Sequence, residues 1–368
     1  MVVINVICRA SFFAVLVTWS TGGLLAAVLP EDRADVMYHS YDGGGVEVNG
    51  PAVLVRKGFR QNFSLSASYY QDAISGASPD VIATASKYSD TRDEFSVSAD
   101  YLHNDAVINM SFTNSEESDY TANTYHLGLS QEVFGGMTTV TLGVSRGDDE
   151  VGNVDNPAFS EDVDRMSYQL GLSQILSDSL IVNANLVTVA DEGFLNNPYR
   201  KVRILGVFAG DEVYPRTRTS HALSFSGKYY WASRLVGSVG YRYFTDTWDI
   251  DAHSFNIGLS YALDTLSILD VYYRYYDQGQ ASFYSDNFDA QQNYMARDKE
   301  LSQFSNHTIG VQASYQLFNA RYGLDRGTLN VGLEGISYDY DNYTDATGTG
   351  ENYSFDAYTA KIFFSVWY

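Results

Sequence analysis

The chain has 368 residues, including 30 tyrosines, 20 phenylalanines and one cysteine, and its formal net charge is −22. An acidic total argues against a nucleic-acid-binding protein, which needs a basic surface. A single cysteine excludes an internal disulfide and a cysteine-based metal site.

Residues 1–26 are predicted to be a cleaved secretory signal peptide. Arg9 precedes an apolar run over residues 10–17, and the small residues Ala26 and Ala27 supply a cleavage site. The alternative is a membrane anchor, but the run is shorter than the roughly 20 apolar residues of a spanning helix. Removal of the signal would leave a mature chain with no thiol.

Residues 46–368 show apolar and small polar side chains in strict alternation. Leu235 and Val239, for example, alternate with Ser238 and Gly240. Successive side chains of a strand point to opposite faces, so one face would suit lipid and the other a wet interior. The pattern predicts an all-β fold, a transmembrane antiparallel up-and-down β-barrel that fills residues 46–368 as one domain.

The connections between these strands are predicted to alternate between short and long. Turns such as His103–Asp105 contrast with segments such as Gly193–Thr217 and Gly279–Gln303. Short periplasmic turns and long extracellular loops are typical of such barrels, whose strand number is even. Fifteen strands are evident, so residues 27–45 are predicted to hold an N-terminal segment and a first strand, Asp35–Tyr41. The total is then about 16.

The last eleven residues form a final alternating strand that ends on an aromatic side chain. This ending resembles the C-terminal signal by which Gram-negative outer-membrane barrels are recognised and inserted. It implies an outer-membrane location, with lipid, lipopolysaccharide and the barrel-assembly machinery as partners. The residues assigned to the insertion signal are Tyr358, Ile362, Phe364, Val366 and Tyr368.

Polar and aromatic clusters at strand ends and in the long segments carry a second resemblance. The clusters span residues 72–79, 193–200, 214–218, 241–246, 273–278, 281–286 and 296–302. Their order resembles a Gram-negative family catalogued as domain of unknown function 3570, from about Val36 to Ser302 and more weakly to the C-terminus. The resemblance implies an outer-membrane barrel with no settled activity. It also implies a redox context, because members are encoded near thioredoxin-like and flavin-attaching periplasmic proteins.

Arginines gathered near the ends of strands form the candidate site. One hypothesis is that they bind a carboxylate or phosphate through forked hydrogen bonds. The other is that they pair with neighbouring aspartates and brace the loops. The candidate residues are Asp72, Arg200, Arg203, Arg216, Arg218, Arg242, Asp246, Arg274 and Arg297.

No catalytic residue, cofactor or metal site is expected. The six histidines show no ligand spacing of the His-x-x-x-His kind. The favoured function is a pore, transport or binding barrel, within an envelope redox or export assembly. Two alternatives stay open: a barrel enzyme of the lipase-like hydrolase class acting on lipid or envelope substrate, and a structural barrel that tethers periplasmic partners.

Overall fold

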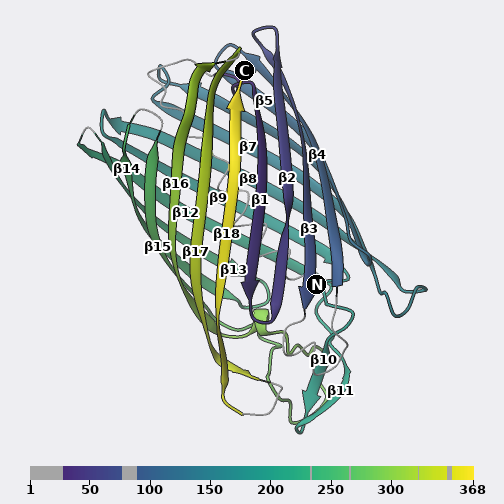
Figure 1. Ribbon diagram of the computed structural model, residues 1–368. Helices are drawn as coiled ribbons and strands as arrows, with labels where there is room; N and C mark the ends of the chain where they lie inside the picture. Colours follow the sequence, from purple (N-terminus) through teal and green to yellow (C-terminus); the bar gives the residue numbers. More distant parts are fainter. Residues whose placement is uncertain (1–27, 77–88, 233, 265–266, 322, 346–349) are drawn as a thin grey trace.

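The computed structural model describes residues 28–76, 89–232, 234–264, 267–321, 323–345 and 350–368. Sixteen antiparallel strands of this part of the chain close into one barrel (Figure 1). The order around the barrel follows the chain, and β18 pairs with β1. The predicted up-and-down barrel of about 16 strands is therefore confirmed. The predicted signal peptide lies outside the described residues.

The barrel strands are 11 to 21 residues long. Their bounds are β1 Arg33–Gly43, β2 Val46–Phe59, β3 Phe63–Gly76, β4 Ser89–His103, β5 Ala106–Glu116, β6 Tyr120–Val133, β7 Thr138–Gly152, β8 Ser160–Ser177, β9 Leu180–Gly193, β12 Thr217–Ala232, β13 Leu235–Asp246, β14 Asp251–Ala262, β15 Ile268–Gln278, β16 Phe304–Arg321, β17 Leu324–Thr344 and β18 Asn352–Trp367. Two further strands, β10 Lys201–Ile204 and β11 Val207–Asp211, form a separate hairpin, and η1 Lys299–Leu301 is a short 3-10 helix.

The first strand, β1, closes the barrel between β2 and β18. Ala34 lies opposite Val366 on one side and opposite Val55 on the other. The β1–β2 turn needs left-handed backbone at Gly44 and Gly45, with φ of 59° and 80°, which glycine adopts without a steric penalty. The hairpin expected from the glycine run is present, and β1 extends two residues beyond each end of the predicted segment.

The two ends of the barrel differ in their connections. Tight turns join strands at the end where β18 finishes, whereas the connections 194–216 and 279–303 lie at the other end, where β10 and β11 project beyond the wall (Figure 1). Several strands run further than the alternation suggested. For example, β7 continues to Gly152 and β8 begins at Ser160, so this connection is only residues 153–159.

The outer wall of the barrel is apolar and the inner wall is polar. Large apolar side chains point outward and are exposed. The exposed fraction is 61 % for Val239, 63 % for Ile309 and 58 % for Leu333. Small polar side chains such as Ser238 and Asn256 occupy the opposite face. An apolar wall left open in this way suits a lipid environment. No helix in the described part of the chain has the length and apolar character needed to cross a membrane.

Candidate functional site: the lumen and its outer mouth

On the inner wall, polar residues of neighbouring strands lie at common levels. Around one level, Ser224 of β12 pairs with Arg242 of β13, and Arg242 pairs with Ser254 of β14. One level further from the long loops, Asn256 of β14 pairs with Arg274 of β15. The strict alternation of the strands therefore places both arginines on the lumen side.

Arg242 and Arg274 have no ion-pair partner among the described residues. The side chain of Arg242 is exposed, and Arg274 is half-buried with one Nη2–H···Oγ1 hydrogen bond of 3.2 Å to Thr308. Within the described part of the chain, these two cations thus face the lumen with no carboxylate at ion-pair distance. Guanidinium groups in this state can bind a passing carboxylate or phosphate through two parallel hydrogen bonds.

At the long-loop end, the segments 194–216 and 279–303 fold together and form a small apolar core. Short β-bridges join them, with Ile204 beside Phe288 and Val213 beside Met295. The core of this mouth domain consists of Tyr214, Trp248, Ile250, Ala281, Phe283, Tyr284, Ala296 and Leu301, all buried. Because these side chains pack on one another, the mouth is lined by folded structure and not by solvated loops.

Ion pairs hold the mouth domain together. Arg200 binds Asp298 at 2.9 Å, and the Asp298 side chain is fully buried. Arg203 and Arg297 both bind Asp286, Arg297 at 2.9 Å. Pairs as buried as these contribute little net stability, but loss of one partner is costly because the other charge stays buried.

Asp286 also binds Thr344, the last residue of β17. Thr344 donates its hydroxyl to one carboxylate oxygen at 2.6 Å and its backbone N–H to the other at 3.2 Å. A single carboxylate therefore joins the segments 194–216 and 279–303 to the end of β17. Arg218 is held separately on β12, where it pairs with Asp246 at 2.5 Å and lies over the Trp248 ring.

Glu212 is, after Asp298, a second buried acid of the mouth domain. Its carboxylate accepts hydrogen bonds from the Arg297 backbone N–H at 2.7 Å and from the Tyr214 hydroxyl at 2.6 Å. Burial, and then the nearby carboxylate of Asp298, raise the pKa of Glu212 to about 7. Burial likewise raises the pKa of the Tyr214 hydroxyl well above its ordinary value.

The candidate residues thus separate into several groups. Arg200, Arg203, Arg218 and Arg297 pair with aspartates of the loops or strand ends, and Arg216 pairs with Glu161 on the outer surface at 3.0 Å. Asp72 lies elsewhere, on β3, where it binds His39 at 2.7 Å and also binds Arg92. Only Arg242 and Arg274 combine a lumen position with the absence of an ion pair among the described residues.

Several charged or polar residues of the interior were not among the candidate site residues. The hydroxyl of Tyr272 donates to Glu334, and Lys361 of β18 lies beside Gly332 on the same wall. Alternation places all three inside, since each follows an outward-facing apolar residue. Three carboxylates, of Asp90, Glu117 and Asp119, also come within 4.8 Å of one another.

The residues of the predicted insertion signal lie along β18. Tyr358 and Ile362 face outward, with 62 and 48 % of their surface exposed. Phe364 pairs with Val36 of β1, and the Tyr368 hydroxyl donates to the backbone carbonyl of Arg56 at 3.0 Å. The segment therefore forms the seam at which the barrel closes.

Comparisons with known proteins agree with this architecture. A family model described as "Protein of unknown function (DUF3570)" matches residues 81–366, which continues to the C-terminus where the sequence resemblance was weaker. No curated protein matches the chain. Among solved structures, a bacterial polysaccharide outer membrane secretin has a TM-score of 0.51 at 7 % identity, over 92 % of this chain and all of that one.

Two proteins from Pseudomonas aeruginosa also match, at lower scores. OccK2 (OpdF), solved in complex with glucuronate, has a TM-score of 0.45 at 11 % identity, over 93 % of this chain and 99 % of that one. The outer membrane protein opdK has a TM-score of 0.44 at 11 % identity, over 91 and 98 %. At these identities the likeness concerns the fold, which is that of outer-membrane barrels.

Proposed function

The chain belongs to the DUF3570 family, and we propose that it is an outer-membrane pore or binding barrel whose lumen attracts small anions. The observation that carries the proposal is the pair Arg242 and Arg274, which face the lumen without an ion-pair partner among the described residues. Charges that line a water-filled passage with low-dielectric walls raise the local concentration of counter-ions. The passage is therefore anion-attracting although the whole chain is acidic.

The mouth domain supports a selective role for this barrel. Its folded core and its buried ion pairs give the loop end a fixed shape. A passage narrowed by ordered structure admits small solutes, and its charged lining decides which of them concentrate there. Carboxylate- and phosphate-bearing solutes fit the forked donors of arginine best.

Reversal potentials in a salt gradient test the proposal. The purified protein in planar bilayers should favour anions, and Arg242→Ala combined with Arg274→Ala should shift the reversal potential toward cations. Arg146→Ala is the matched control, because Arg146 points outward, away from the lumen, and pairs with Asp148 at 3.0 Å. It should leave the selectivity unchanged.

Three outcomes would contradict the anion-attracting pore. They are cation selectivity of the unmodified protein, an equal shift in the Arg146→Ala control, and absence of conductance together with turnover of phospholipid. The last result would favour the barrel enzyme instead.

A further inference from the structure

Residues 199–203 of the mouth domain, which we call the strap, bind two distant parts of the barrel rim. At one end, the hydroxyl of Tyr199 donates to the carboxylate of Asp119, in the connection between β5 and β6. At the other end, Nη2 of Arg203 donates to the hydroxyl of Thr344 at 3.0 Å. A stretch of only four residues therefore links these two points of the rim.

The two contacts of the strap lie almost opposite each other. Asp119 directly precedes β6, and Thr344 ends β17. In the closed barrel of 16 strands, β17 is seven strands from β6 in one direction and nine in the other. At the usual strand spacing and tilt, such a barrel is about 30 Å wide, and the shorter path along its rim is about 40 Å.

The strap is too short to follow the rim. Four residues of chain span at most about 14 Å, and with the side chains at both ends the link reaches roughly 30 Å. That length matches the width of the barrel. Most of the strap is also extended, since it includes Lys201–Arg203 of β10. The strap therefore runs across the opening from one side to the other.

The Arg203 end of the strap is held by several ion pairs. Arg203 shares the carboxylate of Asp286 with Arg297, and the neighbouring Arg200 binds the buried Asp298 at 2.9 Å. Separation of any of these pairs leaves a charge in a poorly solvated place. This end is therefore firmly fixed to the core of the mouth domain.

The Tyr199 end is held by one hydroxyl. Besides donating to Asp119, the hydroxyl accepts the backbone N–H of Val154 at 2.8 Å. Burial, and then the hydrogen bond to Asp119, raise the pKa of Tyr199 above its ordinary value, so the hydroxyl stays protonated as a donor. Hydrogen bonds of a single group are broken more readily than a network of buried ion pairs, so this is the weaker end.

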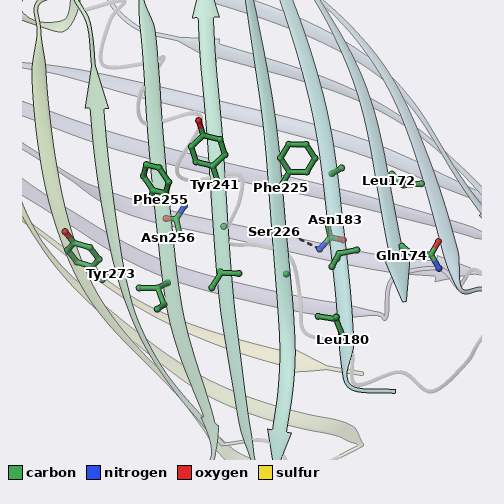
Figure 2. A pocket seen from close by; sticks show the side chains of 16 residues that line it. Leu172, Gln174, Leu180, Asn183, Phe225, Ser226, Tyr241, Phe255, Asn256 and Tyr273 are labelled. Carbon is green, nitrogen blue, oxygen red and sulfur yellow. Dashed lines mark hydrogen bonds between the residues drawn. The ribbon is translucent and has the colours of Figure 1, made fainter. Parts of the chain in front are cut away.

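The inner wall deeper in the barrel carries small polar side chains. Asn183 of β9 donates to the hydroxyl of Ser226 on β12 at 3.3 Å (Figure 2). Ser226 is exposed although it faces the interior, opposite to its outward-facing neighbour Phe225. Open space therefore lies below the strap on this side of the lumen.

We propose that the strap divides the outer mouth, so that small solutes pass beside it, and that it detaches at its Tyr199 end to admit larger ones. A segment fixed at one side and lightly held at the other opens as a hinged lid. The proposal rests on the proposed pore, because a strap restricts entry only where a passage exists.

Thiol labelling in intact cells tests the strap. The only cysteine of the sequence, Cys8, lies in the predicted signal peptide, so Ser226→Cys supplies the reporter in the lumen. This thiol should react with N-ethylmaleimide but only slowly with a maleimide on a poly(ethylene glycol) chain of several kilodaltons. Adding Tyr199→Phe and Arg203→Ala should speed the bulky reaction about tenfold, because hydrogen bonds to charged groups that hold the strap are lost. Heat-modifiable migration checks that the variants fold.

Tyr243→Phe combined with Arg146→Ala is the matched control. Tyr243 donates to Asp251 at 2.7 Å and Arg146 pairs with Asp148 at 3.0 Å, both on the outer face at the same end of the barrel. The control should leave both labelling rates unchanged. Rapid bulky labelling with the strap intact, an unchanged bulky rate in the strap variant, or an equal rise in the control would overturn the proposal.

The labelling result is independent of the anion selectivity, because both reagents are neutral. The expected labelling pattern in a protein that shows no conductance would support the strap and contradict the pore. Anion-selective conductance with rapid bulky labelling of the intact strap would do the reverse.

Discussion

The neighbours Ser238 and Val239 face opposite surroundings although one peptide bond joins them. Val239 is 61 % exposed on the outer wall, whereas Ser238 is half-buried on the inner wall, beside Gly258. At a given depth in the membrane, the cost of a charge therefore depends on which face of the strand the residue occupies.

We expect Val239→Arg to destabilise the barrel by about 2–4 kcal/mol, the cost of an arginine on the lipid face near the middle of the membrane. Ser238→Arg should cost much less, because the guanidinium can reach water in the lumen. Urea unfolding in lipid vesicles measures both. Equal free-energy changes would show that the assignment of the two faces is wrong.

At the scale of elements, the mouth domain depends on Asp286 as a shared partner. Asp286→Ala should leave Arg203 and Arg297 without this counter-charge, so the segments 194–216 and 279–303 should loosen from each other and from the end of β17. Limited proteolysis should then cut within residues 279–303 faster than in the unmodified protein. Asp289→Ala, an exposed aspartate of the same connection, is the control and should leave cleavage unchanged.

The same domain should respond to pH through Glu212. The folded-state pKa of about 7 exceeds the ordinary value of 4.5, so the protonated carboxyl is the form that folding favours. The stabilisation of the packed loops is complete below about pH 4.5 and decreases as the pH rises to 7. Hydrogen exchange of residues 279–303, corrected for intrinsic rates, should show this loss of protection.

Glu212→Gln resembles the protonated carboxyl: it keeps one oxygen acceptor for the Arg297 N–H, places an NH2 donor beside the Tyr214 hydroxyl, and does not titrate. Protection of the loops in this variant should stay constant between pH 4.5 and 7. A variant that still loses protection over this range would place the titrating group elsewhere in the mouth domain.

The sequence predicted the elements of the wall far better than those of the mouth. Alternation is a direct consequence of a two-sided wall, so it identified the strands and even the first hairpin from residues 35–45. The segments 194–216 and 279–303 show no such period, and their contacts join residues about 80 positions apart, such as Ile204 and Phe288. The bracing hypothesis included Asp286 among the partners of the arginines, but a local pattern could not show that Arg203 is one of the arginines it binds.

For the whole molecule, the C-terminal strand β18 closes the barrel by pairing with β1. Deletion of residues 366–368 removes the pairing of Val366 with Ala34 and the hydrogen bond from Tyr368 to Arg56. We expect the truncated chain to fail to assemble, seen as loss of heat-modifiable migration on gels of outer-membrane fractions. Normal migration would mean that neither the seam nor the predicted insertion signal needs these residues.

The triplets Tyr241-Arg242-Tyr243 and Tyr273-Arg274-Tyr275 constrain how this protein can evolve. In each triplet the arginine faces the lumen and the flanking tyrosines face the lipid. Insertion of a single residue before either triplet would exchange the two faces at once, placing a cation in hydrocarbon and two aromatic rings in water. Insertions and deletions are therefore expected to accumulate in the connections, while β13 and β15 change only by substitution.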